Sequence, residues 1–150
     1  MLTAHDVMTE NPTTIPMTAA IGDAVRMLHS LDVRHLPVVD EDGALVGMVS
    51  DRDLKGLSFP EMVGVEYVGA VQTALDAPIS RIMSSDVVSV DVETDVCEII
   101  ELMLDFKIGA VPVVDSDETL VGIVSYVDLL RQVPLDDSSA RTRKARAQRN

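Results

Sequence analysis

The side chains best placed to do chemistry are two serine–aspartate pairs with the same spacing. Ser50 and Asp53 form one Ser-x-x-Asp element, and Ser125 and Asp128 form another. Each follows an apolar run and precedes a short helical pattern, so each is expected where a strand turns into a helix. A first helical turn has unpaired N–H groups and a positive dipole end, which suit a phosphate or ribose oxygen. The same spacing also forms a capping box, and the two roles can coexist.

The two elements belong to an internal repeat. Residues 36–54 recur at 111–129 without a gap, at an offset of 75, and 12 of the 19 positions are identical. Such a repeat indicates one duplicated supersecondary unit, and neither copy need bury its apolar face alone. The chain is therefore predicted to form a symmetric two-lobed module, in which any site at the join is expected twice.

Each copy follows the order β-α-β-β-α, so the predicted fold class is α/β (α+β). Strands are expected at 14–15, 35–39 and 45–49 in the first copy, and at 87–90, 110–114 and 120–124 in the second. The first helix is expected to be capped by Thr18 and to bury Ile21, Val25, Leu28 and Leu31. In the second copy, helices are expected from Thr94 or Asp95 to Gly109 and over 126–132.

The predicted domain organisation has four parts. Repeat 1 covers 1–57, a connector with a helix near 67–75 covers 58–77, repeat 2 covers 78–133, and a flexible basic tail covers 134–150. The helix that begins near Val96 is predicted to be apolar on more than one face, as in a helix buried against a neighbouring chain. Cys97, on this helix, is predicted to be a small core residue.

Composition excludes several classes of function. Residues 1–140 hold all 25 acids and 7 bases, a net charge of −18, whereas the last ten residues hold 5 bases and no acid. This acidic body opposes nucleic-acid binding. No apolar run reaches the roughly 18 to 20 residues that cross a bilayer, and no signal peptide is evident, so a cytoplasmic location is expected.

Catalytic and metal sites are also not indicated. His5, His29 and His35 lack the spacing of metal ligands, and the chain has one cysteine. No Ser-His-Asp arrangement, Walker-type loop or dinucleotide fingerprint is present. The sequence therefore predicts a non-enzyme with no catalytic cofactor and no metal.

The repeated motifs resemble those of a tandem CBS-domain pair, the regulatory module of cystathionine beta-synthase. The resemblance covers about residues 2–132 and rests on three features in order, each present twice. They are Val7-Met8 and Ile82-Met83, then Pro-Val-Val-Asp at 37–40 and 112–115, then apolar-Gly-apolar-apolar-Ser-x-x-Asp at 46–53 and 121–128. It implies two lobes packed with pseudo-twofold symmetry, with a cleft on each side of the join. It also implies a homodimer that binds AMP, ADP, ATP or S-adenosylmethionine and acts as a sensor.

The resemblance also implies roles for particular residues. Ser50 with Asp53, and Ser125 with Asp128, would contact ribose or phosphate. Apolar or backbone contacts to adenine are expected from residues that a plain core position would also explain, namely Ile15, His35, Ile79, Val88, Ala110 and Pro112.

The two copies differ in charge near these motifs. Arg52, Lys55, Arg34 and His35 belong to the first copy, and Val127, Leu130, Gly109 and Ala110 replace them in the second. A phosphorylated nucleotide is therefore predicted to prefer the cleft of Asp53. The cleft of Asp128 would be empty or take an uncharged or cationic adenosine compound, although Arg81 or Arg131 could reach it. Arg34, Arg52 and Lys55 are equally explained as solvated surface.

A second function remains open on the sequence alone. The chain would then be a non-catalytic interaction scaffold with degenerate clefts, and an unknown protein target would bind the helix face or the basic tail. The serine and aspartate present in both copies favour the sensor.

Overall fold

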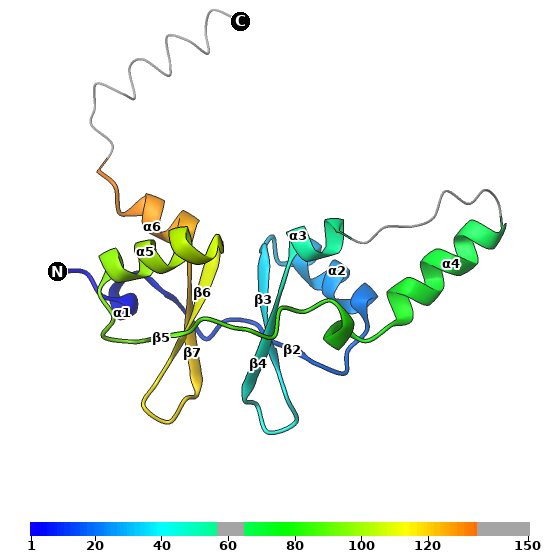
Figure 1. Cartoon of the computed structure of the whole chain (residues 1–150), viewed down its shortest axis with the longest axis horizontal. Helices are drawn as coiled ribbons and strands as arrows, with labels where there is room; N and C mark the ends of the chain where they lie inside the picture. The colour runs from blue at the N-terminus through cyan, green and yellow to red at the C-terminus, as the bar shows by residue number, and fades with distance from the viewer. Residues whose placement is uncertain (57–64, 135–150) are drawn as a thin grey trace, which may run out of the picture.

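The computed structural model describes residues 1–56 and 65–134, which form two lobes with one sheet each (Figure 1). In lobe 1, the sheet order is β2 (Ile15–Pro16), β3 (His35–Val39) and β4 (Leu45–Ser50), with helices α2 (Ile21–Ser30) and α3 (Asp51–Lys55). In lobe 2, β5 (Val90–Asp91), β6 (Ala110–Val114) and β7 (Leu120–Ser125) take the same order, with α5 (Val96–Phe106) and α6 (Tyr126–Arg131). The predicted fold of two β-α-β-β-α repeats is confirmed.

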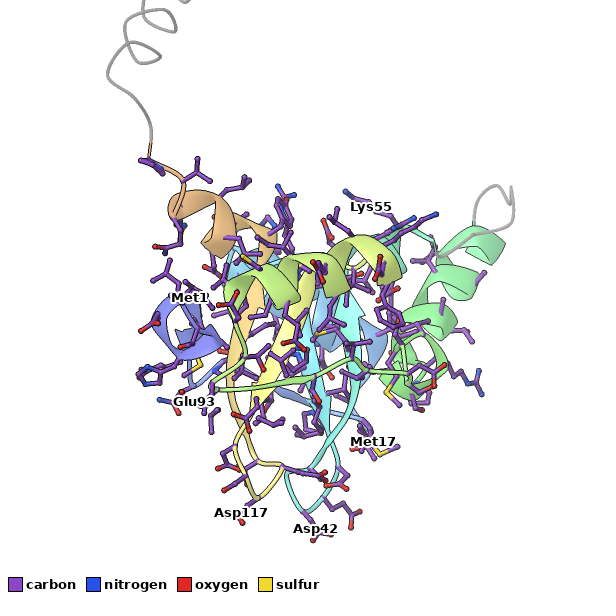
Figure 2. All side chains as sticks on the ribbon, turned by 60° about the vertical axis from the view of Figure 1, so that its left-hand side comes forward. Met1, Met17, Asp42, Lys55, Glu93 and Asp117 are labelled. Atoms are coloured by element: carbon purple, nitrogen blue, oxygen red, sulfur yellow. The ribbon has the colours of Figure 1, made fainter. Side chains whose placement is uncertain are left out.

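The two central hairpins are built in the same way. In the first, the Asp40 carboxylate accepts the N–H groups of Asp42 and Ala44, and Gly43 has φ +80°. In the second, the Asp115 carboxylate accepts from Asp117 and Thr119. The two turns, marked by Asp42 and Asp117, lie beside each other at one end of the molecule (Figure 2). The aspartate that ends each Pro-Val-Val-Asp motif therefore sets the turn, and with it the register of both hairpins.

The N-terminal segment, which precedes repeat 1, completes lobe 2. The segment that precedes repeat 2 completes lobe 1. Strand β1 (Thr9–Glu10) pairs antiparallel with β7 of lobe 2, and Ala4 and Val7 on α1 (Ala4–Val7) lie in the lobe 2 core. Figure 2 shows Met1 on the same side of the molecule as Glu93. Conversely, Ile79 is fully buried in the lobe 1 core. The folding unit thus differs from the sequence repeat, because the two halves exchange their first segments.

A methionine packs on a glycine at each exchanged segment. A Cβ at Gly47 would fall 2.6 Å from Met83 Sδ, and a Cβ at Gly122 would fall 2.9 Å from Met8 Cγ. Both distances are too short for a side chain at the glycine without movement of the methionine. The Val-Met and Ile-Met steps and the glycine of the second motif therefore form one packing contact across the chain.

Several element boundaries and faces differ from the predictions. Helix α2 starts after Ala20, whose N–H is accepted by the Asp23 carboxylate, and not after Thr18. Helix α5 ends at Phe106, because Lys107 takes a left-handed conformation, so Gly109 lies beyond it. The exposed fractions of Val25 and Leu31 are 40% and 45%, so neither is a core residue.

Two other features, Cys97 and the connector between the repeats, were also predicted from the sequence. Cys97 is exposed, which corrects its predicted core position. The connector helix is α4 (Val65–Asp76), which contacts α2, and a short 3-10 turn η1 (Ile79–Arg81) follows it. The rest of the predicted connector before residue 65 and the basic tail from residue 135 lie outside the described residues.

Candidate functional site

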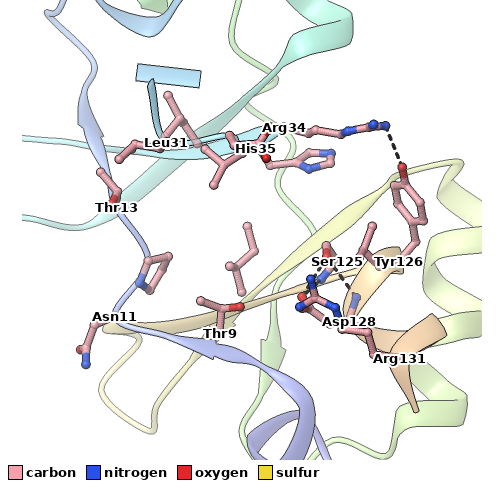
Figure 3. Close-up of a pocket in the computed structure, with 16 residues that line it drawn as sticks. Thr9, Asn11, Thr13, Leu31, Arg34, His35, Ser125, Tyr126, Asp128 and Arg131 are labelled. Atoms are coloured by element: carbon pink, nitrogen blue, oxygen red, sulfur yellow. Dashed lines mark hydrogen bonds and ion pairs between the residues drawn. The ribbon is translucent and has the colours of Figure 1, made fainter. Parts of the chain in front are cut away.

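A cavity of about 450 Å³ lies between the two lobes and contains one of the two serine–aspartate pairs. Lobe 1 contributes residues 31–36, lobe 2 contributes Ile123, residues 125–128 and Arg131, and the N-terminal segment contributes Thr9 and residues 11–13. Figure 3 shows Arg34 and His35 on one side of this space and Ser125, Asp128 and Arg131 on the other. Cavities of this size hold small organic ligands.

The pair in this cavity is a complete capping box. Asp128 Oδ2 accepts the backbone N–H of Ser125 at 2.8 Å and its hydroxyl at 2.8 Å, and Ser125 Oγ accepts the N–H of Asp128 at 3.3 Å. The second oxygen, Oδ1, lies 3.7 Å from Arg131 Nη1, and the side chain of Asp128 is 12% exposed. One carboxylate oxygen thus holds the helix start, and the other is left for Arg131 or a ligand.

Ser50 and Asp53 form the same box at the start of α3. Asp53 Oδ2 accepts the N–H and the hydroxyl of Ser50 at 2.8 and 3.1 Å. Neither residue lines the cavity of Asp128. Arg52 and Lys55 are exposed on the same helix, and Lys55 Nζ lies 3.7 Å from Asp51 Oδ2. The capping role is therefore present in both copies.

The placement of Arg34 and His35 requires a correction. Both were predicted in the cleft of Asp53, but both line the cavity of Asp128. Arg34 Nη1 donates a hydrogen bond of 2.8 Å to Tyr126 Oη, which belongs to lobe 2. A Cβ at Gly109 of lobe 2 would fall 3.2 Å from the His35 ring. The start of β3 faces the other lobe, so the Arg34 side chain contacts the helix start of lobe 2 across the join.

This correction adds a cation to the predicted contents of the cleft, which also contains carboxylates. The cavity of Asp128 is lined by Arg34 and Arg131, one from each lobe, together with Asp32 and Asp128. The sequence analysis allowed that Arg131 could reach this cleft, and Arg131 lines the cavity. Two guanidinium groups on opposite walls suit a phosphate, which accepts several hydrogen bonds at once.

The predicted adenine contacts fall mainly in the two cores. Ile15 and Ile79 are buried in lobe 1, Ala110 and Pro112 are buried in lobe 2, and Val88 is half-buried. None of these five lines the cavity. The sequence reasoning missed Thr13 as a wall residue, although Thr13 stands 75 positions before Val88 and so occupies the equivalent place in the repeat.

Burial at the join lowers the pKa of His35 below its ordinary value of 6.5, and Arg34 lowers it further, although Asp51 and Asp53 act in the opposite direction. The unfolded chain therefore binds more protons than the folded chain below pH 6.5. His35 contributes stability above that pH, and this contribution is lost as the pH falls through the folded-state pKa. We expect His35→Gln to lose less unfolding free energy than the wild type between pH 7.5 and about 5.5.

Urea unfolding at the two pH values measures this difference. His29→Gln is the matched control, because His29 is exposed on α2. The control should follow the wild type at both pH values. Equal losses in the wild type and the His35 variant would show that His35 does not carry the effect.

Two further classes of site are absent from the part of the chain that the structure describes. There, no three His, Cys, Asp or Glu side chains gather so that they could hold a metal ion. In the same residues, no helix combines the length and apolar character needed to cross a membrane.

Comparison with known proteins gives a consistent result. The family model of the CBS domain matches residues 4–58 and 79–135. The chain is 39% identical over 115 residues to an uncharacterized 33.4 kDa protein in the ribosomal RNA operon of Thermofilum pendens, an alignment that covers 74% of this chain. The chain spans only 38% of the length of that relative and 23% of an inosine-5'-monophosphate dehydrogenase of Methanocaldococcus jannaschii.

Two solved structures resemble both lobes together. The structure of CBSX2 in complex with AMP has a TM-score of 0.72 and 29% identity, over 87% of this chain and 95% of the other. The CBS domain pair of protein MJ0100, in complex with 5'-methylthioadenosine and S-adenosyl-L-methionine, has a TM-score of 0.70 and 27% identity, over 87% and 94%.

Proposed function

The chain belongs to the CBS domain family, and from this premise we propose that it is a regulatory module that binds a phosphorylated adenosine in the cavity of Asp128. The observation that carries the proposal is the position of the Ser125–Asp128 helix start opposite Arg34 in a space between the lobes. The module acts by binding and has no catalytic role.

The ligands of similar proteins support the ligand class. CBSX2 is similar to this chain over nearly its whole length and binds AMP, and the MJ0100 pair binds 5'-methylthioadenosine and S-adenosyl-L-methionine. The shared chemistry is an adenosine group, and the compounds differ in the charge at the 5' position. The charged side chains of this cavity therefore decide between the ligands.

The charges of the cavity favour a phosphate over a sulfonium group. Asp128 Oδ1 accepts a ribose hydroxyl, a role that a carboxylate with one free oxygen can fill. Arg34 and Arg131 bind the phosphate from opposite walls. A sulfonium cation would enter a cavity that both arginines line, although Asp32 also lines it. AMP is thus the first candidate, and ADP and ATP differ from it only in added phosphate.

A thermal-shift series tests the ligand and its charge. At a concentration of 100 times its dissociation constant, AMP should add about 2.7 kcal/mol to the unfolding free energy, which raises the melting temperature by several degrees. Adenosine at the same concentration, which lacks only the phosphate, should give a smaller shift, and S-adenosylmethionine should give the smallest.

The outcomes separate the two functions that the sequence left open. Stabilisation by adenosine compounds without regard to charge would keep the sensor and contradict the phosphate preference. No shift with AMP, ADP, ATP, S-adenosylmethionine or guanosine compounds would contradict the sensor and favour the interaction scaffold.

The proposed mechanism is a shift between arrangements of the two lobes. Because Arg34 and Arg131 come from different lobes, a phosphate between them favours the arrangement in which both reach it. The hydrogen bond from Arg34 to Tyr126 already crosses the join, and a phosphate competes for the same guanidinium group. We further propose that the chain works as a homodimer, whose partner affinity follows this shift.

A further inference from the structure

One titratable side chain of the cavity of Asp128 has no part in the binding proposed above. His35 lines this cavity and is half-buried, and Figure 3 shows its ring next to Arg34, across the cavity from Asp128. Among the described residues that line the cavity, His35 is the one whose ordinary pKa lies near neutrality. Its imidazole is neutral or cationic within a narrow range of pH, so its state changes the charge of the cavity.

The fold of the lobe does not require a ring at this position. His35 pairs with Ser50 at the start of β3, and Ala110 occupies the equivalent place in lobe 2, where it pairs with Ser125. The ring instead fills a space that the other lobe leaves open, because a Cβ at Gly109 would fall 3.2 Å from both Cε1 and Nε2 of His35. The imidazole is therefore matched to the join and its cavity, and not to the packing of its own sheet.

We propose that His35 contacts the phosphate of the bound adenosine compound and takes up a proton as this ligand binds. The inference rests on the proposed function, and it adds a phosphate-binding residue and a response to pH. Arg34 directly precedes His35 in the chain and lines the same cavity, so a phosphate held by the Arg34 guanidinium comes next to the imidazole. A protonated imidazole donates through both ring nitrogens, and its charge strengthens a hydrogen bond to phosphate.

The charges around His35 leave its protonation state sensitive to a ligand. Burial and the Arg34 guanidinium favour the neutral ring and lower its pKa below 6.5, although the carboxylates of Asp51 and Asp53 on α3 oppose them. The facing start of β6, at Gly109, is uncharged. Further charged or titratable groups line the cavity from the segment before β3 and from α6, namely Asp32, Tyr126, Asp128 and Arg131. A bound phosphate adds negative charge beside the ring and so raises the pKa of His35.

This rise fixes the direction of the pH dependence. Between the pKa of His35 in the free protein and its higher pKa in the complex, binding takes up a proton. The affinity therefore increases as the pH falls through this interval, and it levels off below the pKa of the free protein. Because a rise of one pH unit in the pKa corresponds to about tenfold in affinity, we expect an increase of about 3- to 10-fold between pH 7.5 and about 5.5.

Isothermal titration with adenosine 5'-sulfate at these two pH values tests the proposal. The sulfate ester keeps one negative charge throughout this range, whereas a phosphate ester has a second pKa of about 6 and would itself titrate. The wild type and His29→Gln should show the increase in affinity, and His35→Gln should lose it. Adenosine, which lacks the anion, should bind the wild type equally at both pH values. An increase that persists in His35→Gln, or an equal increase with adenosine, would overturn the proposal.

Proton NMR of the imidazole signals reads the proton directly in the wild type. The chain has three histidines, and the variants His5→Gln and His29→Gln assign the signals of the other two. The titration midpoint of His35 should move to higher pH when adenosine 5'-sulfate is bound, while those of His5 and His29 stay in place. A His35 midpoint that stays in place or moves to lower pH would contradict the proton uptake.

The inference and the proposed function fail in different ways. If adenosine 5'-sulfate and AMP bind but the His35 midpoint does not rise, this inference is wrong and the sensor function stands. If neither compound binds at either pH, the sensor function is wrong and the inference falls with it.

Discussion

Asp128→Asn is expected to weaken AMP binding by 10- to 100-fold, while Asp53→Asn leaves the affinity of the same cavity unchanged. The asparagine oxygen can still accept the N–H of Ser125, so the helix start is kept. What is lost is the charged oxygen that lies 3.7 Å from Arg131 and is free to accept a ribose hydroxyl. A hydrogen bond to a charged group contributes about 1.5–3 kcal/mol, which corresponds to this loss of affinity.

Isothermal titration with AMP measures the two variants under the same conditions. Asp53→Asn is a close control, because Asp53 forms the same box with Ser50 but does not line the cavity. The melting temperatures without ligand report any loss of capping in either variant. Equal losses of affinity from the two substitutions would contradict the assignment of AMP to the cavity of Asp128.

The internal repeat allowed most of the fold to be predicted. The strands of both hairpins, β3 with β4 and β6 with β7, are placed within one residue of their expected bounds. The signal was strong because an aspartate turn joins two apolar runs, and because the pattern occurs twice. The capping boxes were predicted for the same reason, since their residues lie three positions apart in one local element.

The contents of the cleft were not predictable in the same way. Arg34 lies close in sequence to Ser50 and Asp53, and local reasoning assigned it to their cleft. The structure shows it bound to Tyr126, 92 positions away, because the start of β3 faces the other lobe. Local pattern gives the face on which a side chain lies, but not which lobe stands opposite that face. The helix surface shows the same limit, since Cys97 follows an apolar pattern yet is exposed.

The sequence analysis also did not predict that the two halves exchange their first segments. Strand β1 has two residues and α1 has four, so neither carries a measurable periodicity. Their positions are fixed by contacts far along the chain, such as the N–H of Ala4, which donates to the carbonyl of Thr94 at 2.8 Å. Short elements held by distant partners are the part of this fold that depends on tertiary structure.

Ala4→Asp is therefore expected to destabilise a lobe that lies about ninety residues further along the chain. Ala4 is fully buried in the lobe 2 core, beside Val7, Val111 and Val124. An aspartate at the first position of a helix is locally favourable, because it faces the positive end of the dipole. Any loss of unfolding free energy must then come from burial of an unpaired charge. The expected loss is about 4 kcal/mol or more.

Urea unfolding with hydrogen exchange measures both the size and the place of this loss. His5→Asp puts the same charge one residue later, at an exposed position of the same helix, and should change the unfolding free energy by less than about 0.5 kcal/mol. In Ala4→Asp, faster exchange should begin at the amides of β6 and β7 before it reaches β3 and β4. Faster hydrogen exchange in lobe 1 alone would place the N-terminal helix in the core of its own repeat. That result would contradict the swap of first segments between the two halves.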